Sequence, residues 1–205
     1  MSGKIILVNG ASSSGKSTLC RALQAALPEL FWYLSIDHFR ELGIVPWERV
    51  RSGEFDRQAL RPALFEGFYR MLPALAEAGN NLLIEHILAP NDYPERLFEV
   101  LAPFEVFFVG VHCPLDELER RERERGDRPI GDARQDSAVT HTYGAYDIEV
   151  DSTQPVAENA ATVITAWKAR KVPTLLRPIH GSCRPPKGYP AGRFSHSKFP
   201  PTIQT

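Results

Sequence analysis

Residues 4–18 read Lys-Ile-Ile-Leu-Val-Asn-Gly-Ala-Ser-Ser-Ser-Gly-Lys-Ser-Thr. The uninterrupted Ile, Leu and Val predict a strand buried on both faces, as in a parallel sheet that helices cover. The residues from Gly10 to Ser17 match G-x-x-x-x-G-K-[ST], the Walker A pattern. An amphipathic helix pattern starts at Lys16, so the loop joins a strand to a helix as this pattern requires. The stretch therefore predicts a phosphate-binding loop.

The spacing within this loop has a direct physical reason. Its backbone must turn back so that successive N–H groups point at one phosphate, and glycines permit the angles and the close approach. The positive end of the following helix attracts the same anion. Lys16 is expected to reach the β- and γ-phosphates and Ser17 to offer its hydroxyl to Mg²⁺. We expect ATP to be held by Gly10, Ala11, Ser12, Ser13, Ser14, Gly15, Lys16, Ser17 and Thr18.

Short apolar runs alternate with helical patterns along the chain. Strands are expected at residues 4–9, 32–36, 82–84, 106–111 and 147–150. Helices are expected at residues 16–27, 59–78, 94–101, 115–125 and 156–171. The alternation predicts an α/β fold, a P-loop NTPase or kinase-like three-layer sandwich with a mostly parallel five-stranded sheet. Ligands of such sheets bind at the carboxyl ends of the strands.

Asp37 stands at one of these strand ends and has two interpretations. It precedes a predicted helix, where Asp is a common N-cap. It is also placed to act as the general base that accepts the proton of an alcohol during phosphoryl transfer.

Glu85 follows the apolar residues 82–84, which is a weak Walker B pattern with Glu in place of Asp. A carboxylate there is expected to hold Mg²⁺, directly or through water. His86 is interpreted as a polar residue of the pocket wall, because no set of metal-ligating side chains surrounds it in the sequence.

Five arginines fall between Glu119 and Arg128. One interpretation is a solvated helix with ion pairs three and four residues apart. The other is the lid of a small kinase, whose arginines close over the phosphates and stabilise the charge of the transition state. The residues favoured for this role are Arg125 and Arg128, next to the break at Gly126, with Arg121 as a further candidate.

Composition limits the class of protein. The 205 residues carry a net charge of −1, which excludes a globally basic nucleic-acid binder. Residues 1–170 form the predicted domain, with 18 basic and 25 acidic residues, and residues 171–205 hold six basic residues, no acidic ones and seven prolines. That extension is expected to be irregular, and nucleic acid is expected as a partner only through it.

No apolar run is long enough for a membrane span or a signal peptide. Three widely separated cysteines indicate neither a disulfide framework nor a zinc site, so a cytoplasmic setting is expected.

Several motifs together resemble those of the chloramphenicol phosphotransferase-like family. The similarity begins with the strand and loop at residues 5–17 and includes Ser35-Ile36-Asp37. Residues 121–128, Arg-Glu-Arg-Glu-Arg-Gly-Asp-Arg, are similar to R-E-x-x-R-G-D-R of the family. Residues 141–153 resemble its H-x-x-x-x-Y-D-x-x-V-D-T-T segment. The resemblance covers about residues 4–170 and departs at Glu85-His86, where the family pattern has Asp-Asp.

The resemblance implies a kinase-like fold, a base at Asp37 and transfer of phosphate from ATP to a primary hydroxyl of the antibiotic chloramphenicol. The resulting hypothesis is an ATP- and Mg²⁺-dependent phosphotransferase for a hydroxyl of a small molecule. The alternatives are a kinase for a nucleoside, a sugar or an RNA end, and a nucleotide-binding regulatory module without turnover. His141 is expected either to orient a phosphate or acceptor or to pack structurally. Asp151 is expected either near the nucleotide base or in a turn.

Overall fold

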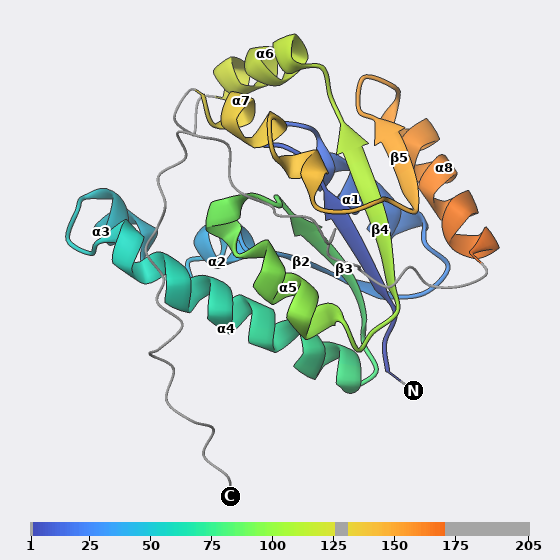
Figure 1. The fold of residues 1–205 in the computed structure, drawn as a ribbon, viewed down its shortest axis with the longest axis horizontal. Coiled ribbons are helices and arrows are strands. Elements are labelled where there is room, and N and C mark those ends of the chain that lie inside the picture. The colour runs from blue at the N-terminus through green and yellow to red at the C-terminus, as the bar shows by residue number, and fades with distance from the viewer. Residues whose placement is uncertain (1, 126–130, 171–205) are drawn as a thin grey trace, which may run out of the picture.

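A computed structural model describes residues 2–125 and 131–170. Its five strands form a single sheet in the order β2-β3-β1-β4-β5, and every neighbouring pair is parallel. Figure 1 shows this sheet with α4 and α5 in front of it. The strands are β1 (Ile5–Asn9), β2 (Phe31–Ser35), β3 (Asn81–His86), β4 (Val106–His112) and β5 (Ile148–Asp151).

Helices connect these strands and cover both faces of the sheet (Figure 1). The α-helices are α1 (Lys16–Ala26), α2 (His38–Glu41), α3 (Trp47–Arg51), α4 (Arg57–Glu77), α5 (Pro94–Leu101), α6 (Leu115–Arg125), α7 (Asp132–Ser137) and α8 (Val156–Ala169). Two short 3₁₀ helices are η1 (Pro90–Asp92) and η2 (Thr140–Thr142).

Alternate residues of β1 enter two different cores. Ile5 and Leu7 pack with α4 and α5, whereas Ile6 and Val8 pack with α1 and α8. All four side chains are fully buried. Burial of an aliphatic side chain contributes about 1.5–3 kcal/mol, so the two cores hold the central strand tightly between the helical layers. The predicted α/β three-layer sandwich with its parallel five-stranded sheet is confirmed.

The boundaries of the predicted strands and helices agree with the structure within two residues. The strand predicted from the apolar residues 82–84, with Glu85 and His86 at its end, runs from Asn81 through Glu85 and His86. Glu85 therefore sits inside the sheet, opposite Val8 of β1 and Ser35 of β2.

Helices α3 and α7 were not predicted, although α2 begins at His38 as expected. Both missed helices have six residues or fewer, too short to show an amphipathic repeat. Arg128, Cys183 and the extension at residues 171–205 lie outside the described residues. Within the described residues, Cys20 and Cys113 form no disulfide. Among the helices in the described part of the chain, none has the length and apolar character needed to cross a membrane.

Candidate active site

The loop after β1 turns back on itself to form a cradle at the start of α1. A Cβ at Gly10 would lie 2.7 Å from the carbonyl oxygen of Val111, so only glycine fits this close approach of two backbones. Gly15 has a left-handed φ of 89°, which glycine adopts without strain. Ser13 shares the left-handed region, with φ 63°. These angles build the anion-binding turn that the Walker A pattern predicts.

Three serine hydroxyls in this cradle are buried and have no hydrogen-bond partner in the described part of the chain, namely those of Ser12, Ser13 and Ser14. A buried hydroxyl without a partner carries a desolvation cost of about 1–3 kcal/mol. The phosphate oxygens of a nucleotide are acceptors that suit these groups and the neighbouring amides. The Lys16 side chain is also buried, and its Nζ donates to the carbonyl oxygen of Ala11 at 2.7 Å.

Glu85 and Ser17 meet at the carboxyl end of the sheet. The Ser17 hydroxyl donates to Oε1 of Glu85 at 2.8 Å, and the Tyr33 hydroxyl donates to Oε2. Glu85 is 8% exposed, and the burial of Tyr33 beside this carboxylate raises the pKa of the Tyr33 phenol. A carboxylate and a hydroxyl are the hard oxygen ligands that Mg²⁺ takes alongside nucleotide phosphates. The residues present therefore fit the ion expected from the sequence.

Asp37 follows β2, and its side chain lines a large cavity that begins at the phosphate loop. It stands directly before α2, but it makes no capping hydrogen bond and has helical backbone angles (φ −65°, ψ −24°). Asp37 thus occupies the N-cap position of α2, but its side chain does not cap the helix. Its Oδ1 atom lies 4.0 Å from Nη2 of Arg40, a residue that sequence reasoning missed.

Beyond Asp37, η1 and α4 line a second half of the pocket. Arg61 of α4 pairs with the buried carboxylate of Asp92 and stacks over the ring of Phe65, 4.7 Å from its centre. His86 lies deeper, with Nε2 2.7 Å from the Tyr69 hydroxyl. Burial lowers the pKa of His86 to about 4, so this imidazole is neutral near neutral pH. The prediction of His86 as a polar residue of the pocket wall agrees with this position.

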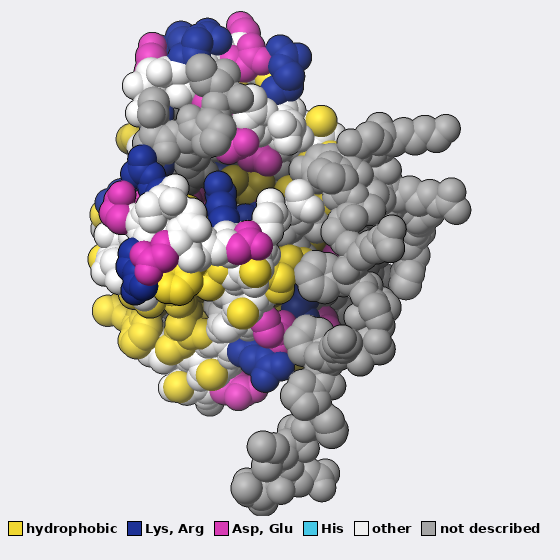
Figure 2. Space-filling model, turned by 90° about the vertical axis from the view of Figure 1, so that its left-hand side faces the viewer, with side chains coloured by type: hydrophobic (Ala, Val, Ile, Leu, Met, Phe, Trp, Pro, Cys, Tyr) yellow, Lys and Arg dark blue, Asp and Glu magenta, His cyan; other side chains and the backbone are white. Residues whose placement is uncertain are grey.

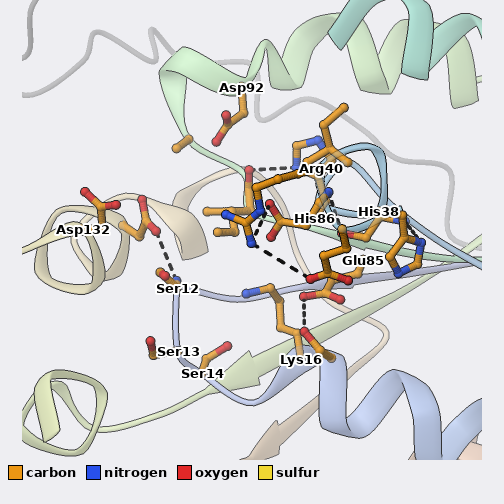
Figure 3. A pocket seen from close by; sticks show the side chains of 18 of the residues that line it. Ser12, Ser13, Ser14, Lys16, His38, Arg40, Glu85, His86, Asp92 and Asp132 are labelled. Atoms are coloured by element: carbon orange, nitrogen blue, oxygen red, sulfur yellow. Dashed lines mark hydrogen bonds and ion pairs between the residues drawn. The ribbon is translucent and has the colours of Figure 1, made fainter. Parts of the chain in front are cut away.

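The two halves belong to one cavity of about 1990 Å³, which extends from the phosphate loop to α3 and α4. Figure 2 shows a hollow in this face of the molecule, with basic side chains inside it. In the closer view of Figure 3, Lys16 and Glu85 lie on the phosphate-loop side, and His86 and Asp92 lie opposite. The cavity is large enough to hold a nucleotide and a second small molecule together.

Two of the three candidate arginines, Arg121 and Arg125, lie in α6, and they differ in position, whereas Arg128 lies outside the described residues. Arg121 donates to the hydroxyl and the carbonyl oxygen of Ser152 at 3.1 and 3.0 Å. Its Nη1 lies 3.5 Å from the position that a Cβ on Gly15 would take, so the guanidinium lies beside the phosphate loop. Arg125 also lines the cavity. Arg120 instead forms exposed ion pairs with Glu117 and Glu124, as a solvated helix would.

Glu122 was not recognised from the sequence, because it sits in a run of charges. It is 4% exposed and accepts from the backbone amides of Gly131 and Ala133 at 2.9 and 2.8 Å. This carboxylate fixes the start of α7 against α6. Asp136 of α7 in turn accepts from the backbone N–H of Ser12 at 3.1 Å, so α7 reaches the phosphate loop.

The structure separates the alternatives for His141 and Asp151. His141 stacks on His112 with ring centres 4.0 Å apart, and its Nδ1 lies 2.7 Å from the Tyr146 hydroxyl. It is absent from the cavity wall as the described residues define it, which supports packing. Asp151 accepts from the amide and the hydroxyl of Thr153, both at 2.8 Å, which is a turn.

Comparison with known proteins identifies the family. The sequence profile described as "Chloramphenicol phosphotransferase-like protein" matches residues 3–168. The chain belongs to this family. Two strains of Mycobacterium tuberculosis have relatives named "Putative O-phosphotransferase" that are 29% identical over 198 residues. The match spans 83% of this chain and 85% of each relative.

Two of the solved structures that share this fold are kinases of small molecules. An APS kinase from M. tuberculosis matches with a TM-score of 0.59 and 20% identity over 82% of this chain and 99% of its own. A shikimate kinase from Acinetobacter baumannii matches with a TM-score of 0.57 and 17% identity over 82% and 95%. Family and fold together make this chain a phosphotransferase of the P-loop kinase type.

Proposed function

We propose that the protein transfers the γ-phosphate of ATP to a hydroxyl of a small molecule in a Mg²⁺-dependent reaction. The observation that carries this proposal is the shared cavity. The phosphate loop, the Ser17–Glu85 pair and Asp37 line one half, and a separate wall built by α3, α4 and η1 lines the other. A nucleotide-binding module without turnover would need only the half of the cavity that holds the phosphate loop. It would not need a carboxylate such as Asp37 between two ligand sites.

In the proposed reaction the acceptor hydroxyl attacks the γ-phosphorus, and the bond to the oxygen bridging the β- and γ-phosphates breaks. ADP leaves with that electron pair, and Asp37 takes the hydroxyl proton. Lys16 moves from the Ala11 carbonyl to the β- and γ-phosphates, where its charge offsets the negative charge on the oxygens. Mg²⁺, held by Ser17 and Glu85, would neutralise the phosphates when bound. Among the arginines within the described residues, Arg125 is assigned to contact the phosphoryl group as it is transferred.

We assign further roles to the remaining residues of the site. The loop from Gly10 to Thr18 holds the nucleotide, and Arg121 with Ser152 forms the wall beside it. Arg128 keeps its predicted role at the transferring phosphate. Because of the family, chloramphenicol is the first acceptor to test. Antibiotic resistance is, for the same reason, the first biological role to test.

The test is transfer of labelled γ-phosphate to a panel of hydroxyl compounds that includes chloramphenicol, nucleosides, sugars and hydroxy acids. We expect a labelled organic phosphate with the wild-type protein and almost none with Lys16→Ala, whose fold should stay intact. Arg120→Ala is the matched control, because it removes a cation from exposed ion pairs outside the cavity. No labelled product from any acceptor, with ATP still bound, would favour the regulatory module.

A further inference from the structure

The acceptor half of the cavity contains an arginine that is mostly buried and makes no hydrogen bond through its guanidinium to the described residues. Arg40 extends from α2, and its side chain is only 24% exposed. Its two nearest carboxylate oxygens, on Asp37 and Glu41, are each 4.0 Å away. That distance is beyond a hydrogen bond, and the two contacts come from its own short helix and from the residue directly before that helix. The five N–H donors of its guanidinium thus have no acceptor within hydrogen-bond distance among residues 2–125 and 131–170.

Arg40 points into the space where an acceptor would lie. In Figure 3 its side chain extends toward the region between Lys16 and His86. Asp37, the proposed base, is its neighbour at the end of β2. A group bound to Arg40 would therefore lie close to the hydroxyl that loses its proton to Asp37.

Arg57 is a second arginine of this wall without a carboxylate partner among the described residues. It opens α4 and stands over the ring of Trp47, with its central carbon 5.5 Å from the ring centre. Both residues line the cavity. The other wall arginines differ, because Arg61 pairs with Asp92 and Arg51 pairs with Glu48.

We propose, on the basis of the proposed function, that the acceptor is a hydroxylated organic anion whose carboxylate, sulfate or phosphate group binds Arg40, with Arg57 at the rim. A guanidinium matches the paired oxygens of all three groups. A neutral acceptor would leave Arg40 with only the two carboxylates 4.0 Å away and with no hydrogen bond for its guanidinium from the described residues. The nucleotide does not need Arg40, since the phosphate loop, Lys16 and Arg121 already surround its site.

The test measures binding separately from transfer. The full chain is first saturated with Mg²⁺ and a non-hydrolysable ATP analogue, so that the phosphate loop is filled. Matched pairs are then titrated by calorimetry: shikimate and its methyl ester, gluconate and sorbitol, AMP and adenosine, and chloramphenicol as a further neutral compound. We expect an anionic member to bind at least about tenfold more tightly than its neutral partner.

The variant Arg40→Gln should weaken binding of that anion by about 10- to 100-fold and leave the affinity for the ATP analogue unchanged. Arg40→Lys should restore part of the loss. Arg49→Gln is the control, because this residue of neighbouring α3 pairs with Glu54 and does not line the cavity.

Three results would overturn the proposal: no binding by any anionic probe at millimolar concentration, tighter binding of the neutral members, or equal loss of the ATP analogue in Arg40→Gln. The last result would assign Arg40 to the γ-phosphate. Binding of an anion through Arg40 without labelled product in the transfer assay would leave this inference standing and contradict the proposed function instead.

Discussion

The Ser17 hydroxyl lies 2.8 Å from Oε1 of Glu85, a contact that joins the first turn of α1 to the carboxyl end of β3. The other carboxylate oxygen accepts from the Tyr33 hydroxyl of β2. Helix α1 and strand β2 therefore orient the buried carboxylate of β3 toward the end of the phosphate loop. Both oxygens of Glu85 are fixed by neighbours, which supports the proposal that Glu85 holds Mg²⁺ where the family pattern has Asp.

The first prediction concerns this carboxylate. Glu85→Gln keeps the size but loses the charge, so the Mg²⁺ concentration for half-maximal activity should rise. Tyr33→Phe removes only the supporting hydroxyl and should weaken Mg²⁺ binding by about 10- to 100-fold, as loss of such a supporting group does at metal sites. Activity measured across a Mg²⁺ titration checks both variants. An unchanged titration curve for Glu85→Gln would remove this residue from the ion site.

The second prediction separates two neighbouring arginines of α6. Arg121→Ala should raise the Kd for ATP by about tenfold, because Arg121 holds Ser152 beside the phosphate loop. Arg120→Ala removes an equal charge from the exposed side of the same helix and should leave the Kd within about twofold. Equilibrium titration with ATP measures both. Equal effects of the two substitutions would indicate a general influence of charge.

The third prediction concerns the rate of transfer. Arg125→Ala should lower kcat by about 10²- to 10³-fold with a smaller change in KM for ATP, because a preorganised donor acts on charge that develops in the transition state. Arg123→Ala is the control, since this exposed neighbour does not line the cavity. Full activity of Arg125→Ala together with a lower melting temperature would instead indicate a structural ion pair.

The fourth prediction is a loss of stability in acid. Burial lowers the pKa of His86 to about 4 from a usual 6.5, so the unfolded chain binds the proton more tightly than the folded one. The free energy of unfolding should therefore be at its full value above about pH 6.5 and fall as the pH drops toward 4. This residue alone accounts for a loss of about 2 kcal/mol between about pH 7.5 and pH 5.

Denaturant titrations at the two pH values check this prediction. His86→Gln should reduce the difference between them, whatever it does to the stability at neutral pH. His141 contributes in the same direction, because burial and the nearby His112 lower its pKa to about 4 as well. The same pH dependence in wild type and in a variant lacking both imidazoles would show that other groups cause it.

The sequence predicted the fold from features that are local and periodic. The apolar run of β1 and the loop that follows it determine a buried parallel strand and an anion cradle, and both are present. Asp37 could be placed at the end of β2 because a strand end is visible where an apolar run stops. Its orientation could not be predicted, since whether Asp caps a helix depends on backbone angles that the sequence does not show.

The site residues that could not be predicted from the sequence lie in short elements or depend on contacts between distant parts of the chain. Arg40 and Asp92 come from a four-residue helix and a three-residue 3₁₀ helix, neither of which has a recognisable repeat. Tyr33 belongs to a predicted strand, but its partner Glu85 is 52 residues away, and only the pairing of β2 with β3 brings them together. Arginines within the charged run of α6 look alike in the sequence, and only helix packing distinguishes Arg121 from Arg120.

The central claim concerns Asp37: its carboxylate, at the end of β2, accepts the proton of the acceptor hydroxyl. Asp37→Asn keeps the shape of the side chain and cannot take that proton. The decisive measurement is kcat of this variant on a true acceptor, with ATP affinity and melting temperature measured in parallel. The account predicts a loss of about 10²- to 10⁴-fold in kcat with little change in the other two quantities. Turnover within a few-fold of the wild type would contradict it and make Glu85 the next candidate for the base.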